Sequence, residues 1–293
     1  MYTLKEYKTN SGTPYVVASG IDTLDIFKTF DCGQCFRFEP VSLFGNKYEF
    51  GGVAFSRYVV FAQNSFDEII VYGSSAKEFE QIWAPFLSLD TSYSEINSHI
   101  LSVVDAEHMK LATEYSNGIR ILRQEPWEAL CSFIISQNNN IPRIKKIISE
   151  LCLKYGKECY FEGKTYYSFP TINDLNLAGV DGIFALKTGF RAKYIFDATE
   201  KLLSKEVKLE DIFLCDYECA EKELSKIKGI GPKVAACTLL FGFNKTEAFP
   251  IDVWMKRSLE NHFDGKIDVV ALGKTAGIAQ QYLFYYERYN QEK

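Results

Sequence analysis

The chain has 293 residues, of which 47% are hydrophobic and 24% are charged, and its formal net charge is −5. This length and composition suffice to bury a sizeable core, in about two domains. No basic segment followed by an apolar stretch opens the chain, and no apolar run approaches the roughly 18 residues of a membrane span. We therefore expect neither a signal peptide nor a membrane span, but an intracellular protein, in the cytoplasm or nucleoid if the source is bacterial.

The charge distribution matters more than the total for a nucleic-acid partner. A negative net charge weighs mildly against such a partner, because phosphate binding is mostly electrostatic. The lysines and arginines, however, cluster at 143–146, 187–193 and 226–233. The negative net charge therefore does not exclude a nucleic-acid partner.

Residues 1 to about 75 predict an antiparallel sheet. Short runs of β-branched and aromatic residues are separated there by Gly or Asn, as strands and their turns require. One helix around residues 23–29 is expected to interrupt the strands. The predicted strands are 15–17, 35–38, 48–50, 58–61 and 69–72.

The eight cysteines are expected to be reduced thiols, several of them in the core. Cys32 and Cys35 form a CxxC pair, which by itself suggests redox or metal chemistry. No second CxxC accompanies it, and Phe36 and Phe38 continue a strand-like alternation. We therefore expect no metal at this pair.

From residue 76 onward the hydrophobic period becomes helical. Phe79, Ile82, Trp83 and Phe86 fall on one helix face, and a capping box at 92–95 precedes a helix. The remainder reads as almost wholly helical. The sequence thus predicts an α+β protein, with a β-rich N-terminal domain over residues 1–112 and a helical body over 113–293.

The segment 217–243 predicts two helices joined by a tight hairpin. The first amphipathic helix reads to about residue 228, two glycines bracket one apolar residue, and Pro232 opens the second helix. Bare backbone N–H groups at such a helix N-terminus make a ready site for a phosphate. The hairpin residues expected to bind it are Gly229, Gly231 and Val234.

This hairpin, together with Phe249-Pro250-Ile251-Asp252, resembles the helix–hairpin–helix DNA glycosylases. Lys233 and Asp252 match the catalytic lysine and aspartate of that superfamily. The alternative is a non-catalytic DNA-binding module, in which Lys233 neutralises a phosphate and Asp252 caps a helix.

Three further stretches are similar to one family, the 8-oxoguanine DNA glycosylases. With the segment around Cys32, they extend the match from about Cys32 to Phe284, most of the chain. The resemblance implies an N-terminal antiparallel sheet domain with helices, followed by an all-helical helix–hairpin–helix glycosylase body. The three stretches are 126–144, 186–194 and 276–284.

The chemistry that the resemblance implies needs an amine and a carboxylate. A neutral lysine attacks the sugar C1′, releases the base and forms a Schiff base with the opened sugar. Burial and the positive end of a helix dipole both favour a neutral amine, and the first helical turn offers both to Lys233. Asp252 would stabilise positive charge on the sugar and help to move the lysine proton. Strand scission by β-elimination can then follow.

The resemblance also implies a pocket for the flipped base. The backbone carbonyl of Gly33 would accept from the N7–H of 8-oxoguanine and repel the N7 lone pair of guanine. Cys237 and Phe284 would sandwich the base, and Gln280 would bond its Watson–Crick edge. Read without the family, the alternatives are a plain turn glycine for Gly33 and an ordinary buried seam for Gln280 and Phe284.

Residues that read the opposite strand are implied in two other stretches. Asn138, Arg143 and Arg191 would contact the orphaned cytosine, since arginine donors match its acceptor edge. Phe190 would be an apolar wedge that kinks the DNA, where the family usually has Tyr. The alternatives are a simple helix-to-helix turn for Asn138, a solvated charge for Arg191 and core packing for Phe190.

One residue departs from the family pattern. The family commonly has His two residues after the catalytic aspartate, and this chain has Trp254, which can donate one bond but carries no charge. His99, His108 and His262 show no metal spacing, and we assign them no role.

The substrate expected is duplex DNA with 8-oxoguanine opposite cytosine, and the protein is expected to act as a monomer. We expect no organic cofactor and no catalytic metal, although a monovalent cation at the hairpin is compatible with the sequence. The rival enzymes are glycosylases for damaged pyrimidines, which commonly carry iron–sulfur cysteines, and lysine-free glycosylases for alkylated purines. No cysteine follows Cys237, and Lys233 is present, so both rivals are disfavoured.

Overall fold

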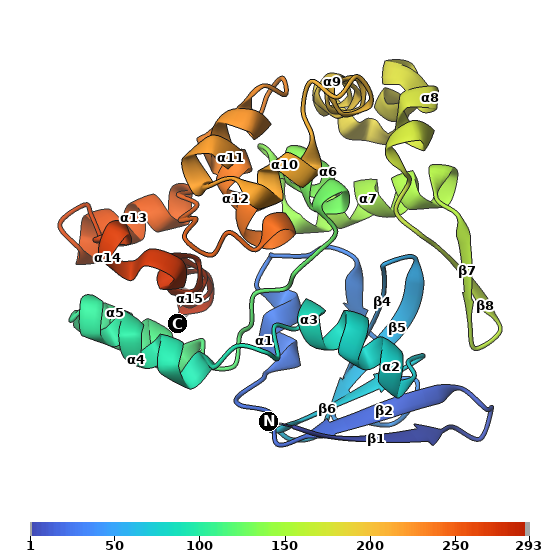
Figure 1. The fold of residues 1–293 in the computed structure, drawn as a ribbon, viewed down its shortest axis with the longest axis horizontal. Helices are drawn as coiled ribbons and strands as arrows, with labels where there is room; N and C mark the ends of the chain where they lie inside the picture. The colour runs from blue at the N-terminus through green and yellow to red at the C-terminus, as the bar shows by residue number, and fades with distance from the viewer. Residues whose placement is uncertain (1, 291–293) are drawn as a thin grey trace.

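The computed structural model describes residues 2–290, and it confirms an α+β fold with an N-terminal sheet and a helical body (Figure 1). The sheet has six antiparallel strands in the order β1-β2-β6-β5-β4-β3. Four of the five predicted strands are confirmed as β2, β4, β5 and β6. The strands are β1 (Thr3–Lys8), β2 (Pro14–Ser19), β3 (Phe38–Pro40), β4 (Tyr48–Ala54), β5 (Arg57–Gln63) and β6 (Glu68–Tyr72).

The predicted strand at 35–38 is wrong except for Phe38, which begins β3. Cys35 and Phe36 are buried in the segment between α1 (Ile26–Asp31) and β3, and they face different cores. Cys35 packs with the sheet, whereas Phe36 meets Phe133 of the helical body with ring centroids 6.0 Å apart. The alternation that resembles a strand therefore comes from a segment that lies between two cores.

One face of the sheet is covered by helices of the N-terminal part. Phe30 of α1 stacks on Phe50 and Phe61 of the strands, each at 5.3 Å between centroids. The helical residues from 76 onward add Trp83 and Phe86 to the same core, as their spacing predicts. These turns are α2 (Ala76–Glu78), a π-helical turn (Phe79–Trp83) and α3 (Ala84–Phe86).

A hairpin that the sequence did not predict covers the other face. Strands β7 (Glu158–Phe161) and β8 (Lys164–Tyr167) form an antiparallel pair that reaches from the helical body to the sheet (Figure 1). Tyr166 stacks on Tyr58 of β5 at 3.7 Å, and Phe161 also packs against Tyr58. The expectation that residues after 76 are almost wholly helical is therefore wrong for this segment.

The helical body is built around α12 (Pro232–Phe243), which is buried along nearly its whole length. It packs on α6 (Pro126–Ser136), where Phe133 stacks on Phe241 at 5.3 Å. The other helices are α4 (Tyr93–Val103), α5 (Glu107–Tyr115), α7 (Ile141–Tyr155), α8 (Ile172–Ile183), a π-helical turn (Phe184–Thr188), α9 (Arg191–Leu203), α10 (Leu209–Leu214), α11 (Tyr217–Ser225), α13 (Val253–His262), α14 (Val269–Leu272), a 3₁₀ turn (Gly273–Thr275) and α15 (Ala276–Asn290).

Helices α4 and α5 contribute to the core of the helical body and not to that of the sheet. Helix α5 packs along α15, and the Ser116 hydroxyl just after α5 donates to the carbonyl of Tyr282 at 3.0 Å (Figure 1). The domain boundary at residue 112 falls within α5 and stays a prediction. Among the helices of residues 2–290, none is both long and apolar enough to cross a membrane.

Candidate active site

The helix–hairpin–helix lies where the sequence predicts it, with α11 and α12 as its two helices. The first helix ends at Ser225, three residues earlier than expected. Gly229 has φ +79°, and a Cβ atom there would lie 2.3 Å from Cδ2 of Tyr194, so only glycine fits. Gly231 is the exposed N-cap of α12, and its neighbourhood within 4 Å holds nothing that a Cβ atom would meet. The N-terminus of α12 is therefore open to an approaching phosphate.

Lys233 occupies the first turn of α12, at the partly exposed end of an otherwise buried helix. Its Nζ atom lies 5.9 Å from the ring centroid of Phe133 on α6. One turn further along α12, Cys237 is 5% exposed. Burial raises the pKa of the Cys237 thiol, an effect that the nearby Lys233 ammonium partly offsets. Cys237 is therefore a neutral thiol at neutral pH and a weak nucleophile.

Asp252 is the N-cap of α13, as its sequence context predicts. Its Oδ1 atom accepts a hydrogen bond from the backbone N–H of Met255 at 2.9 Å. A carboxylate accepts on two oxygens, so the capping bond fixes the side chain without excluding a second role for Oδ2.

One cavity of about 70 Å³ brings together both predicted catalytic residues and all four predicted pocket residues. Its walls come from the segment after α1, from α6 and α12, from the start of α13 and from α15. Besides Lys233 and Asp252, the predicted residues around it are Gly33, Cys237, Gln280 and Phe284. Five further residues line it that the sequence analysis did not assign to the pocket: Cys32, Phe133, Phe241, Pro250 and Gln281.

The glycine of this cavity stands in a rigidly held turn. Gly33 has φ +78°, and a Cβ atom there would lie 3.6 Å from the ring of Phe284. The neighbouring Gln34 is fully buried; its amide donates to the carbonyls of Thr29 and Arg120 at 2.9 and 2.8 Å. From α15, Gln281 donates to the carbonyl of Cys32 at 2.8 Å. Gln34 and Gln281 are thus positioning residues, and nothing in the local sequence pattern distinguishes them from surface glutamines.

The four residues predicted to read the opposite strand form a second cluster. Arg191 is only 3% exposed and donates to the carbonyls of Gln137 and Asn138 in the turn between α6 and α7. Asn138 itself is exposed and has φ +47°. Phe190 is 47% exposed, and the Arg191 guanidinium lies 4.5 Å from its ring centroid. The alternative of a solvated Arg191 charge is therefore wrong, because this side chain is buried and bonded to the turn that carries Asn138, whereas its contact with the opposite base stays a prediction.

Arg143 completes this cluster from the start of α7. It is exposed, and its guanidinium approaches the carbonyl of Lys187 at 3.4 Å. The cluster connects to the hairpin through Tyr194, whose ring meets that of Phe190 at 5.7 Å and covers Gly229. The wedge residue and the hairpin are therefore fixed relative to one another.

Trp254 lies in the first turn of α13, two residues after Asp252, and is partly buried. The guanidinium of Arg257 lies 5.9 Å from its ring centroid. A positive charge is thus present beside the position where the family pattern has His, although on another side chain.

Two family models together match residues 16–267. The model described as "8-oxoguanine DNA glycosylase, N-terminal domain" matches residues 16–130. The model described as "HhH-GPD superfamily base excision DNA repair protein" matches residues 131–267.

Two proteins of similar sequence are named N-glycosylase/DNA lyase. An N-glycosylase/DNA lyase of Saccharomyces cerevisiae is 35% identical over 184 residues, which are 59% of this chain and 48% of that protein. The match therefore spans about half the length of the yeast relative. The N-glycosylase/DNA lyase OGG1 of Arabidopsis thaliana is 30% identical over 266 residues, 86% of this chain and 70% of that protein.

A solved structure extends the similarity over the whole fold. It is the Clostridium acetobutylicum 8-oxoguanine glycosylase/lyase in complex with double-stranded DNA containing cytosine opposite 8-oxoguanine. It is 34% identical and superimposes with a TM-score of 0.88, covering 99% of this chain and 98% of that one.

Proposed function

Because this chain belongs to the 8-oxoguanine DNA glycosylase family, we propose that it excises 8-oxoguanine from duplex DNA and then nicks the strand by β-elimination. The observation that carries the proposal is the single cavity that holds a lysine amine, a carboxylate and a hydrogen-bonding pocket. A bare DNA-binding hairpin has no need for such a cavity.

Lys233 is the proposed nucleophile. Its Nζ atom forms a bond to the sugar C1′ while the bond from C1′ to the base nitrogen breaks and the base leaves with a proton. The opened sugar then forms a Schiff base, which acidifies the C2′ proton and permits loss of the 3′ phosphate. Asp252 stabilises positive charge on the sugar, and the cap bond to Met255 supports this role by fixing its carboxylate.

The pocket selects the oxidised base through one hydrogen. The carbonyl of Gly33 accepts from N7–H, and the hydrogen bonds of Gln34 and Gln281 support this role by holding its turn rigid. Gln280 bonds the Watson–Crick edge, while Cys237 and Phe284 enclose the two faces. A cavity of about 70 Å³ is smaller than typical ligand pockets of roughly 300 Å³ or more. Lining side chains, of which Phe284 is only partly buried, therefore shift when the base enters.

The opposite strand is read by the second cluster. Asn138 enters the gap left by the flipped base, Arg143 and Arg191 contact the orphaned cytosine, and Phe190 wedges the duplex. The bonds from Arg191 to the turn carbonyls support a joint role, in which this side chain also holds Asn138 in place. The cytosine opposite 8-oxoguanine in the Clostridium complex is consistent with this preference.

Further features belong to the same proposal. Gly229, Gly231 and Val234 bring backbone N–H groups to a DNA phosphate, and a monovalent cation can bridge the hairpin carbonyls and that phosphate. The amine and the carboxylate supply the chemistry, so the reaction needs no organic cofactor or catalytic metal.

One chain supplies every group, so the enzyme acts as a monomer. It works inside the cell, in the cytoplasm or nucleoid of a bacterial source.

Borohydride trapping tests this function. A duplex with one 8-oxoguanine opposite cytosine is incubated with wild type and with Lys233→Gln in the presence of borohydride. We expect a covalent adduct with wild type and none with the variant. Base release without trapping would overturn the role of Lys233 and leave Asp252 to activate water. If wild type showed no base release and no trapped adduct, the proposed activity would be overturned and a non-catalytic DNA-binding module would be favoured.

A further inference from the structure

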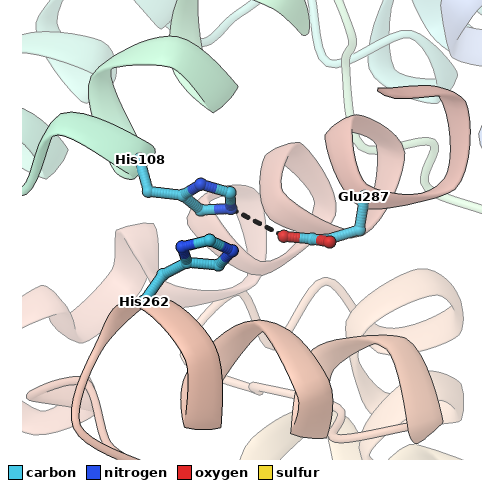
Figure 2. Close-up of side chains that lie close together, drawn as sticks. All are labelled: His108, His262 and Glu287. Carbon is cyan, nitrogen blue, oxygen red and sulfur yellow. Dashed lines mark hydrogen bonds and ion pairs between the residues drawn. The ribbon is translucent and has the colours of Figure 1, made fainter. Parts of the chain in front are cut away.

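Three side chains from distant parts of the sequence meet at the C-terminal end of α13, whereas the cavity meets Asp252 at the N-terminal end of this helix. His108 comes from α5, His262 is the last residue of α13, and Glu287 lies on α15 (Figure 2). Their positions in the chain give no metal-binding spacing, and only the packing of the three helices brings them together.

The geometry of the group is compact. The two imidazole rings are stacked, with centroids 3.7 Å apart and planes inclined by 7°. Nε2 of His108 lies 2.6 Å from Oε1 of Glu287. Figure 2 shows that each ring turns one nitrogen toward the Glu287 carboxylate, and one donor atom from each residue lies within 4.8 Å of the others.

These distances suit a divalent cation. Zinc binds imidazole nitrogen and carboxylate oxygen at about 2.0–2.2 Å, so two ligands of a tetrahedral zinc ion lie roughly 3.3 Å apart. The pairs observed here range from 2.6 Å to at most 4.8 Å and bracket that value. An imidazole lone pair lies in the plane of its ring, so the two stacked rings must tilt apart and the contact between His108 and Glu287 must open before the three donors surround one ion.

The surroundings suit an ion held at the surface and not in the deep core. The side chains of His108 and Glu287 are 15% and 8% exposed, whereas His262 is exposed. The rings of Phe263 and Tyr286 stand edge-on to His108 at 5.8 and 5.2 Å. An ion among the three donors thus has an aromatic wall behind it and a solvent side on which water can be the fourth ligand.

We propose that His108, His262 and Glu287 form a zinc site that fastens α13 and α15 to α5. Two imidazoles and one carboxylate match the ligands that zinc prefers. Copper and nickel also favour such donors and are expected to compete in solution.

The site is structural and not catalytic. Helix α13 has 10 residues, so Asp252 at its start and His262 at its end are about 15 Å apart. At that distance the ion touches no reacting atom. It anchors the far end of the helix that Asp252 caps, and it anchors α15, which carries Gln280 and Phe284. The inference goes beyond the proposed function and does not depend on it.

Direct metal binding to the chelator-treated protein without DNA tests the site. Zinc is titrated by calorimetry, and cobalt is titrated by visible absorption, because tetrahedral cobalt gives a characteristic spectrum. We expect one ion per chain for wild type and at least a tenfold weaker affinity for His108→Gln and for His262→Gln. The melting temperature should rise with zinc for wild type and stay unchanged for both variants.

His99→Gln is the matched control, because His99 is the one of the three histidines that lies outside the proposed site, and it is exposed. Its zinc affinity should equal that of wild type. All these proteins keep the eight cysteines, so a thiolate site would bind equally in every one of them. Equal binding in His262→Gln, or the absence of stoichiometric binding to wild type, would overturn the proposal. His262 is exposed, so its replacement should leave the fold intact, which circular dichroism checks.

Discussion

At the residue scale, the cavity depends on single positions that only one residue type can fill. Gly33 combines a left-handed backbone with a place against the ring of Phe284. Lys233 lines the cavity and is partly exposed, a combination that the first turn of an otherwise buried helix provides. The sequence predicts Asp252 either as a helix cap or as a catalytic carboxylate, and the two roles are compatible. The residue caps α13 and also lines the cavity.

Gly33→Ala should impair lesion recognition more than folding. The new Cβ atom has ordinary contacts of 3.6 and 3.7 Å, but the φ of +78° strains any L-residue by about 1–2 kcal/mol. The shifted carbonyl should lower single-turnover excision of 8-oxoguanine at least tenfold. Gly12→Ala is the control, since Gly12 has φ +89° and open space around it. Both variants should lose similar stability in urea, and equal excision rates for the two would contradict the role of the Gly33 carbonyl.

At the element scale, Arg191 is a buried cross-link between α9 and the turn after α6. It donates to three carbonyls, those of Gln137, Asn138 and Thr188. Removing the guanidinium leaves these acceptors without their charged donor, at a cost of about 2–3 kcal/mol.

Arg191→Ala should therefore lose about 2–3 kcal/mol of unfolding free energy and also its preference for cytosine opposite the lesion. Arg143→Ala is the matched comparison, because Arg143 is exposed and has one long contact to a carbonyl, 3.4 Å. It should lose preference with a stability change within about 0.5 kcal/mol. Urea unfolding and excision rates opposite the four bases measure both effects. An unchanged preference in both variants would contradict their proposed contacts with cytosine.

Local sequence patterns predict some of the strands and helices and miss others. Strands β2, β4, β5 and β6 follow from runs of β-branched and aromatic residues between turn residues, and the helices of the hairpin follow from apolar spacing, glycines and Pro232. Strand β1 has mostly exposed residues and lacks that pattern. The segment 35–38 alternates because it faces two cores. The hairpin β7–β8 has a local signal, because aromatic residues flank the two-residue turn at Glu162 and Gly163, both with positive φ. The helical pattern on either side of it concealed this signal.

Long-range packing also limits what could be predicted of the sites. Lys233 and Asp252 belong to recognisable motifs. Gln34 and Gln281 act through bonds to backbone far away in the sequence, and no local pattern marks them. His108, His262 and Glu287 converge only because α5, α13 and α15 pack together. Motif spacing reveals groups that share an element, but it does not reveal groups that meet across elements.

At the scale of the whole molecule, the cavity joins the two parts of the chain. Gly33 follows a helix of the sheet domain, whereas Lys233, Asp252 and Phe284 belong to the helical body. Recognition of the base and attack on the sugar therefore require both parts in one fixed arrangement. The bond from Gln281 to the carbonyl of Cys32 is one of the contacts that fix it.

The charge distribution leads to a prediction on this scale. With a net charge of −5, attraction to DNA must come from the clustered lysines and arginines near the hairpin and not from the molecule as a whole. Lys228 is exposed in the hairpin, whereas Lys5 is exposed on the outer strand β1, at the opposite end of the molecule in Figure 1. Of these two lysines, only Lys228 is expected to lie near a phosphate.

Lys228→Ala should reduce the salt dependence of DNA binding. Each phosphate contact contributes about −0.9 to the slope of log K against log salt, so the variant's slope should be shallower by about 1. Binding is measured by fluorescence anisotropy in the Lys233→Gln background, which prevents turnover of the lesion. Lys5→Ala removes the same charge and should keep the slope of its parent. If both substitutions changed the slope equally, net charge and not the hairpin surface would govern association with DNA.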